Sequence, residues 1–302
     1  MDEIVFINRV TRQREQERVY GQRMIELFYG NGWFSRVFSF LFLPLFARIS
    51  FLSWVYGQFQ KSRLSRWKVK PFVHDFQVDA SEFLKPLDAF TSFNDFFIRK
   101  LQPNARPCVS GSDVAVLPAD GRYLVFQNLS LADGFWVKDK LFDLETFLGD
   151  SKLAKQYENG AMVIARLCPV DYHRFHFPCA NVPGASRLIN GPLYSVNPMA
   201  LKRNIAILSE NKRVITPLTT EFFGVVQYVE IGATFVGSIQ QTFESGRSYG
   251  KGEEKGYFEF GGSCLILLFE PGKIVFDQDL IEASLSKIET RGLLGQSLGR
   301  SI

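Results

Sequence analysis

Residues 223–242, FGVVQYVEIGATFVGSIQQT, decide the fold class of this chain. Two runs rich in β-branched and aromatic side chains, Phe223–Ile231 and Thr234–Thr242, are separated by Gly232 and Ala233. Runs of this length and composition, bounded by turn residues, are typical of β-strands. The stretch therefore predicts two strands that follow one another along the chain.

Runs of the same kind recur on both sides of this stretch, at Ala115–Leu117, Tyr123–Gln127, Met162–Leu167, Cys264–Phe269 and Lys273–Phe276. Gly, Pro and Asn separate them, which favours an antiparallel sandwich or barrel. No βαβ series is present, which argues against a Rossmann or TIM architecture. We expect an α+β fold, with helical insertions at Asp143–Leu148 and Pro198–Asn204 and a short helix at Phe93–Lys100 that Thr91 or Ser92 caps.

Positive charge and aromatic side chains are concentrated near the N-terminus. Residues 1–70 carry twelve Lys/Arg and five Asp/Glu, a net charge of +7, whereas residues 71–302 carry −3. The 48 residues from Leu27 to His74 contain no acid and fourteen Phe, Tyr or Trp. Positive charge suits nucleic acid or an anionic membrane. The aromatic side chains favour the membrane, because they enter the headgroup boundary while Arg and Lys meet lipid phosphates.

The apolar stretch Trp33–Tyr56 has 24 residues, against the roughly 20 that cross a bilayer. Arg36 and Arg48 lie within it and Pro44 interrupts it. An Arg near the bilayer centre costs about 2.5–3.5 kcal/mol. We therefore expect amphipathic helices that lie on the membrane. The alternatives are a true span and helices packed on the protein's own core or on a second subunit.

The N-terminal region divides from the rest of the chain at Lys70-Pro71. The pattern predicts a polar-to-amphipathic helix over residues 4–30 and aromatic helices over residues 33–67. We expect a helical region for membrane contact or dimerisation over residues 1–70 and the main domain over residues 71–302.

The overall composition is globular, with 302 residues, 46% hydrophobic and 22% charged. None of the four cysteines stands in a Cys-x-x-Cys pair, which excludes a disulfide scaffold and the common zinc fingers. The first residues, Met-Asp-Glu-Ile-Val, lack the basic start and apolar run of a signal peptide. We expect a reducing, cytosolic compartment.

Two of the three histidines stand close together in Tyr-His173-Arg-Phe-His176-Phe-Pro. Histidine is the commonest general base near neutral pH. Three interpretations are open: core histidines, a metal site completed by Cys168 and Cys179, or catalysis. The spacing Cys-x4-His-x2-His-x2-Cys matches no structural zinc pattern. We expect no metal and favour catalysis.

Two further motifs place reactive groups at turns. Pro-Ala-Asp120-Gly sets a carboxylate between Pro and Gly, which alone is an ordinary turn. Gly261-Gly262-Ser263 precedes an apolar run, and the glycines permit a strained backbone. An activated Ser263 hydroxyl at that place could attack the carbonyl of Gly262. A carboxylate, an imidazole and a hydroxyl together match the logic of a carboxylate-oriented base that deprotonates a serine.

In their order along the chain, these motifs resemble those of the phosphatidylserine decarboxylases. The matching stretches cover about residues 90–302, and each alone would be a weak signal. They are Ser-Phe-Asn-Asp-Phe-Phe-Ile-Arg (92–99), Pro-Ala-Asp120-Gly, Tyr-His173-Arg-Phe-His176-Phe-Pro, Tyr-Ser195-Val-Asn-Pro, Asn211-Lys-Arg-Val-Ile, Ile231-Gly-Ala-Thr-Phe-Val-Gly-Ser and Phe-Gly261-Gly262-Ser263.

The resemblance implies a self-processing enzyme that converts phosphatidylserine to phosphatidylethanolamine. In that family the chain breaks between the Gly and Ser of the last motif, here Gly262 and Ser263, which gives a β chain (1–262) and an α chain (263–302). Ser263 becomes a pyruvoyl group, the covalent cofactor. Its carbonyl forms a Schiff base with the substrate amine and accepts the electrons released with carbon dioxide.

The resemblance also assigns roles, residue by residue. His176 is the base for the cleavage and Asp120 holds its ring. His173 contacts substrate and assists decarboxylation, and Ser195 is a substrate-binding residue. The implied partners are phosphatidylserine in an anionic membrane surface, the chain's own α and β parts and a second copy in a homodimer, with no nucleic acid. The implied location is peripheral, at the cytoplasmic face of the cell membrane.

One residue departs from the family pattern. Cys264 follows the cleavage serine, where the family commonly has Thr, Ser or another small polar residue, and its effect on processing is open. Two alternatives to the decarboxylase stay open. One is a family member that does not cleave and binds lipid as a scaffold, against which the presence of Asp120, His176 and Ser263 argues. The other is a metal-dependent hydrolase that uses the Cys/His cluster.

Overall fold

The computed structural model describes residues 4–18, 20–21, 26–28, 50–131, 143–233, 238–261 and 263–302, with the single positions 30, 32, 33, 35 and 37. Ten strands form one large sheet, in which β8 pairs with β9 outside the main order. In spatial order they are β2 (Arg14–Gln16), β1 (Val5–Asn8), β15 (Glu289–Gly292), β4 (Gly121–Phe126), β5 (Ala161–Leu167), β13 (Ser263–Phe269), β10 (Val225–Gly232), β9 (Arg213–Thr220) and β7 (Asn181–Pro183), with β8 (Arg187–Ile189).

Two three-stranded sheets complete the β structure. One has the order β11 (Ile239–Gln241), β12 (Glu254–Phe258), β6 (Arg174–His176), and the other has the order β14 (Val275–Phe276), β16 (Ser297–Arg300), β3 (Val114–Val116). Only β1 and β15 run parallel among the paired strands of the described residues. The expected α+β class with mainly antiparallel strands is confirmed, and the described sheets stay open rather than closing into a barrel.

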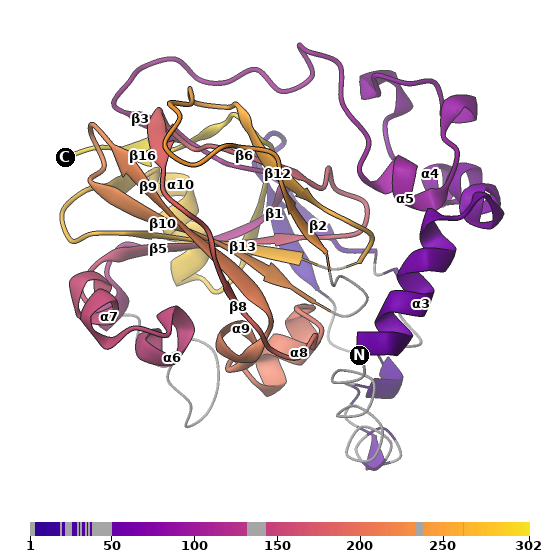
Figure 1. Ribbon diagram of the computed structural model, residues 1–302, viewed down its shortest axis with the longest axis horizontal. Helices are drawn as coiled ribbons and strands as arrows, with labels where there is room; N and C mark the ends of the chain where they lie inside the picture. The colour runs from indigo at the N-terminus through magenta and orange to yellow at the C-terminus, as the bar shows by residue number, and fades with distance from the viewer. Residues whose placement is uncertain are drawn as a thin grey trace.

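Among the described residues, the helices are short. They are α3 (Ser50–Lys61), α4 (Val69–Asp75), α5 (Phe93–Phe97), α6 (Leu144–Leu148), α7 (Ser151–Tyr157), α8 (Pro198–Arg203), α9 (Ile207–Glu210) and α10 (Gln278–Leu285), with 3₁₀ turns η1 (Arg63–Lys68), η2 (Ala80–Glu82), η3 (Leu87–Ala89) and η4 (Leu129–Leu131). The predicted helices near 93, 144 and 198 are confirmed, and Ser92 is the N-cap of α5. Figure 1 shows α6–α9 on one side of the large sheet and the small sheets on the other.

The strands in the middle of the large sheet are buried on both faces. Every residue of β5 and of β13 is buried. Leu265 and Leu267 face the core between the sheets, whereas Cys264 and Ile266 face the core beneath the helices. A strand covered on both faces has a continuous apolar sequence. This explains why the run after Ser263 shows no alternation of polar and apolar residues.

The predicted helix over residues 4–30 is wrong at its start, where the chain forms β1 and β2 instead. Phe6 of β1 is buried beside β15, and Glu17 lies among buried arginines of the sheet. These partners lie more than 100 residues away, so local periodicity could not reveal them. The boundary expected after Lys70 falls inside α4.

Much of the expected membrane segment Trp33–Tyr56 lies outside the described residues; its last part belongs to α3. In the described part of the chain, no helix is long and apolar enough to cross a bilayer. The described aromatic side chains of α3, η1 and α4 are partly in a core and partly exposed. Phe72 and Tyr56 pack into a core with Phe260 and α5, while Trp67 of η1 is exposed. In Figure 1, α3, α4 and α5 lie together at one end of the molecule.

Candidate active site

Ser263 is the first residue of β13, in the interior of the large sheet. It pairs with Leu167 of β5 and with Gly232 of β10, and its exposure is 0%. Its Oγ is buried without a hydrogen-bond partner. Gly261 has a φ of +140°, a conformation that residues with a side chain rarely adopt. Gly262 lies outside the described residues.

His173 precedes β6 and is completely buried. Its Nδ1 lies 3.0 Å from the carbonyl oxygen of Asp171, and its Nε2 has no partner. A carbonyl oxygen only accepts, so Nδ1 must carry the proton and Nε2 must hold a free lone pair. Burial lowers the pKa of His173 to about 3, which leaves the imidazole neutral. His173 is thus neutral, and the lone pair of its Nε2 is free.

The loop before His173 is fixed by charged groups. The Asp171 carboxylate accepts from Arg122 Nη1 at 2.6 Å and from the backbone N–H of Cys168 at 2.8 Å. Burial raises the pKa of the Cys168 thiol well above its usual value, so it stays protonated. These contacts hold the carbonyl of Asp171 in position against His173.

His176 ends β6 and pairs with Glu254 of β12. Its backbone N–H donates to the carbonyl of Pro118 at 2.8 Å, and its Nδ1 is buried without a partner. Burial, helped by the charge of Arg174, lowers the pKa of His176 to about 4. The ring lies 5.8 Å from that of Tyr172.

Asp120 is buried in the turn that follows Pro118. Its carboxylate accepts from Arg106 at 2.8–3.1 Å and from the backbone N–H of Leu294 at 2.9 Å. No hydrogen bond joins the Asp120 and His176 side chains, both of which the structure describes. The structure brings the turn of Asp120 to the backbone of His176, but Arg106, not the imidazole, holds the carboxylate.

Ser195 lies in the connection before α8, and its Oγ accepts from the backbone N–H of Asn197 at 3.2 Å. The four predicted catalytic residues, by contrast, are all buried.

Sequence reasoning missed the part that α5 plays. Asn94 Oδ1 accepts from the backbone N–H of Phe260 at 2.9 Å, and the ring of Phe97 lies 5.0 Å from that of Phe260. Phe97 also stacks on His173, with 3.8 Å between ring centroids. The helix thus contacts both the histidine segment and the segment that leads to Ser263. The stretch 92–99 had matched the family pattern, but nothing in its sequence showed which side chains it would meet.

A metal site built from Cys168, Cys179, His173 and His176 finds no support in the geometry. Among the described residues, no group of three or more His, Cys, Asp or Glu side chains could hold a metal ion. Cys179 is buried, and burial raises its pKa to about 12.

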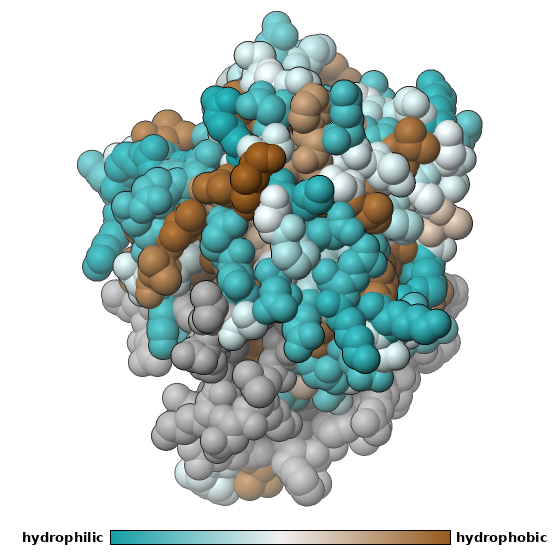
Figure 2. All heavy atoms as spheres, turned by 90° about the vertical axis from the view of Figure 1, so that its left-hand side faces the viewer, coloured by the Kyte–Doolittle hydropathy of each residue, from teal (hydrophilic) through white to brown (hydrophobic). Residues whose placement is uncertain are grey.

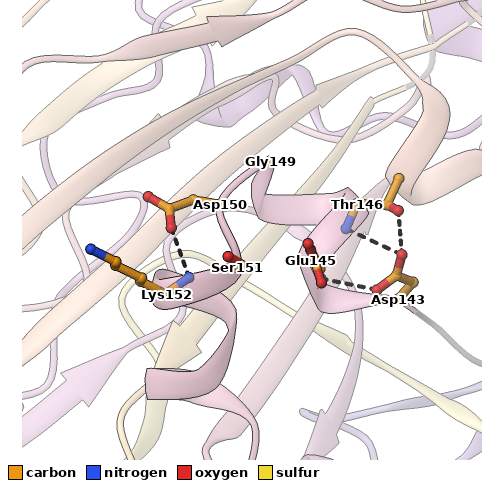
Figure 3. Close-up of a pocket in the computed structure, with 7 residues that line it drawn as sticks. All are labelled: Asp143, Glu145, Thr146, Gly149, Asp150, Ser151 and Lys152. Carbon is orange, nitrogen blue, oxygen red and sulfur yellow. Dashed lines mark hydrogen bonds between the residues drawn. The ribbon is translucent and has the colours of Figure 1, made fainter.

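A surface pocket at the start of α6 and α7 contains none of the predicted site residues (Figure 3). The Asp143 carboxylate accepts from the N–H groups of Glu145 and Thr146, and Asp150 accepts from that of Lys152. The two aspartates therefore cap their own helices. The lining consists of Asp143, Glu145, Thr146, Gly149, Asp150, Ser151 and Lys152.

Comparison with known proteins agrees with the motif order. The family model for phosphatidylserine decarboxylase matches residues 93–299. The "phosphatidylserine decarboxylase proenzyme" of Chlamydia muridarum is 49% identical over 298 residues, 99% of this chain and 97% of that one. The proteins of the same name from Chlamydia pneumoniae and Chlamydia caviae are 48% identical over 297 residues (98% and 97%) and 47% identical over 302 residues (100% and 99%). The chain belongs to the phosphatidylserine decarboxylase family of enzymes.

Proposed function

We propose that this enzyme decarboxylates phosphatidylserine to phosphatidylethanolamine, using a pyruvoyl group that it makes from Ser263 by cleaving its own chain after Gly262. The observation that carries the proposal is the state of Ser263. A buried hydroxyl without a partner is costly in a folded protein, and this one stands at the start of an interior strand, two residues after the unusual backbone of Gly261.

The cleavage needs only groups of the chain and water. Ser263 Oγ bonds to the carbonyl carbon of Gly262, and the peptide C–N bond breaks, which gives an ester and a free amine. Removal of the Ser263 α-proton then expels residues 1–262 as a carboxylate and leaves a dehydroalanine. Its tautomer takes up water and releases ammonia, which produces the pyruvoyl group on residues 263–302.

We assign to His176 the removal of the Ser263 hydroxyl proton. Burial keeps its ring neutral, so a ring nitrogen has a lone pair that can accept the proton. Asp120 supports His176 through the turn 118–120, whose Pro118 carbonyl binds the His176 backbone. Arg106 and Leu294 in turn fix the Asp120 carboxylate.

For the turnover we assign His173 to the substrate and to proton transfer during decarboxylation. Its free Nε2 and its neutral state support this role. Ser195 is assigned to substrate binding. The pyruvoyl group supplies a conjugated carbonyl that takes up the electrons freed when carbon dioxide leaves. A buried, water-poor surrounding strengthens each polar contact with the reacting groups.

We further propose that η1 meets the lipid surface, with the enzyme peripheral at the cytoplasmic face of the cell membrane and acting as a homodimer. Leu64 and Trp67 are 73% and 70% exposed, and Arg63, Arg66 and Lys68 stand beside them in the same turn. Apolar tips flanked by positive charge suit an anionic bilayer. The face in Figure 2, at the other end of the molecule from α3–α5, is mostly hydrophilic, with hydrophobic side chains in a short band and isolated spots.

The test is to incubate the purified enzyme with phosphatidylserine vesicles and to measure phosphatidylethanolamine and carbon dioxide. We expect both products from the cleaved enzyme and neither from Ser263→Ala, which should stay a single chain. Turnover by Ser263→Ala would contradict the mechanism. A wild-type chain that stays intact and binds vesicles without turnover would favour the lipid-binding alternative. Leu64→Ser/Trp67→Ser should weaken binding to the vesicles without changing cleavage.

A further inference from the structure

Arg99 is a buried cation two residues beyond the end of α5. It is 4% exposed, and none of the carboxylates in the described residues forms an ion pair with it. Its guanidinium lies over the rings of Phe83 and Phe96, at 5.1 and 4.8 Å from their centroids. A buried charge without a paired carboxylate costs stability. The place of Arg99 suggests a task that outweighs this cost.

The two acids whose charges act on Arg99 already bind other arginines. Arg106 holds Asp120, and Arg122 holds Asp171. Arg99 instead donates from Nη2 to two backbone carbonyls, those of Val170 at 3.0 Å and Asp171 at 3.2 Å. Its Nε and Nη1 have no partner. All its hydrogen bonding is therefore directed at the loop that leads to His173.

The carbonyl of Asp171 thus receives two donors. One is Arg99 Nη2, and the other is Nδ1 of His173 at 3.0 Å. A carbonyl oxygen has two lone pairs, so both bonds can form together. The guanidinium fixes the direction of this oxygen, and the oxygen fixes the imidazole. With its proton held on Nδ1, His173 keeps Nε2 free, as the unpartnered Nε2 shows.

Arg99 also acts on the charge of His173. Burial is the main cause of the low pKa of His173; Asp171 opposes it and Arg99 adds to it. The neighbours from the other packed elements, Phe97 and the backbone of Phe258, bring no charge. Loss of the guanidinium removes a positive neighbour, so the pKa of His173 should rise.

We propose that Arg99 is a positioning residue for the turnover: through the carbonyl of Asp171 it holds His173 as the tautomer whose Nε2 is free to take a proton. The importance of this tautomer for turnover rests on the role proposed above for His173. The tautomer itself does not, and it can be measured in the cleaved protein without substrate.

The measurement is a ¹⁵N spectrum of the histidine side chains as a function of pH. The chain has three histidines, and His74→Gln identifies the exposed one. In the wild type we expect His173 to be protonated on Nδ1 only. In Arg99→Met we expect a mixture of tautomers and a higher pKa. Arg99→Lys keeps the charge but lacks the planar fork, so it should mix the tautomers with a smaller rise in pKa.

Arg213 provides the matched control. It is 2% exposed and donates to the carbonyls of Phe147, Asn211 and Thr146, and burial lowers its pKa to about 10, as it does for Arg99. Arg213→Met should destabilise the protein and leave the His173 signals unchanged. If Arg99→Lys and every folded Arg99→Met sample keep the wild-type tautomer and pKa, the proposal is wrong. The same holds if Arg213→Met changes the His173 signals as much.

Turnover by the cleaved fraction is the second readout. In Arg99→Met it should fall on the order of 10²-fold, with the acid limb of the pH profile moved to higher pH. Altered tautomers with an unchanged profile would show that the tautomer does not govern turnover, which overturns the role of Arg99. Wild-type protein without turnover would contradict the proposed function instead, whatever the spectra of Arg99→Met show.

Discussion

The ring of Phe97 lies on the imidazole of His173, with 3.8 Å between centroids and 32° between planes. The same ring is 5.0 Å from that of Phe260, three residues before Ser263. One side chain of α5 therefore joins the segment of the histidines to the segment of the serine. The five-residue helix α5, capped by Ser92, therefore fixes the position of His173 relative to Phe260 and the segment that leads to Ser263.

Phe97→Leu should lower turnover more than it lowers stability. The shorter side chain loses the face of His173, and a small displacement of a reacting group costs up to roughly 10²-fold in rate. Phe93→Leu is the matched control, because Phe93 is equally buried and its ring centroid lies 5.2 Å from that of Phe260. Both variants leave a small cavity and should lose similar amounts of stability, on the order of 1–2 kcal/mol, in urea unfolding. Equal losses of turnover in the two variants would contradict the role of Phe97.

The two histidines should separate cleavage from turnover. His176→Ala removes the base assigned to Ser263, so it should yield one uncleaved chain on a denaturing gel. His173→Ala should cleave and then turn over about 10²–10⁴-fold more slowly, the usual contribution of a positioned acid or base. An uncleaved His173→Ala together with a cleaved His176→Ala would mean that the two roles are reversed.

Protonation of Glu17 should lower the free energy of unfolding at acid pH. Burial raises the pKa of Glu17, but Arg166, with bonds of 2.7 and 3.1 Å, outweighs burial and lowers it to about 2 from the usual 4.5. The folded-state pKa is the lower one, so this stabilisation is complete above pH 4.5 and is lost as the pH falls from 4.5 toward 2. It is worth roughly 3 kcal/mol.

Glu17→Gln should therefore lower the free energy of unfolding at pH 7 by about 3–5 kcal/mol, since it leaves Arg166 short of a buried partner. The difference from wild type should shrink below pH 4.5 in urea titrations. Glu221→Gln, at an exposed turn position between β9 and β10, should change stability by no more than about 0.5 kcal/mol. A difference for Glu17→Gln that stays constant from pH 7 to pH 3.5 would contradict the lowered pKa.

Lys255 and Glu230 form an ion pair that is 0% exposed on both sides. Lys255 stands at a bulge of β12 and also donates to Thr216 and Gln241 at 3.0 and 2.9 Å. Glu230→Leu alone should cost about 3–5 kcal/mol, because it leaves a buried ammonium unpaired. The double change with Lys255→Met should restore or exceed wild-type stability in thermal unfolding. A double variant as unstable as the single one would show that the pair itself stabilises the fold.

The sequence predicted the strands best where burial on both faces makes them uniformly apolar, as in Cys264–Phe269. It predicted the site residues from motifs, and the structure buries Asp120, His173, His176 and Ser263. It did not predict the arrangement among them. Arg106, 14 residues before Asp120 in the sequence, donates to its carboxylate, and the backbone carbonyl of Asp171 accepts from His173. A hydrogen bond to a backbone carbonyl does not depend on the residue type, so a sequence pattern cannot predict it.

The helix predicted near the N-terminus was wrong for a similar reason. Val5–Asn8 became a strand because β15, which is nearly 300 residues away, offers a parallel edge. Glu17 looks like one more surface charge in the sequence, yet it lies between Arg122 and Arg166 in the sheet. Long-range partners of this kind decide local structure, and the periodicity of a short stretch carries no information about them.

The central claim is that Ser263 becomes the reactive end of a new chain, and the intact mass of the purified protein under denaturing conditions tests it most directly. The account predicts two chains, residues 1–262 and residues 263–302, the smaller with a blocked pyruvoyl start in place of Ser263. A single chain of 34.5 kDa that stays intact on long incubation would contradict it.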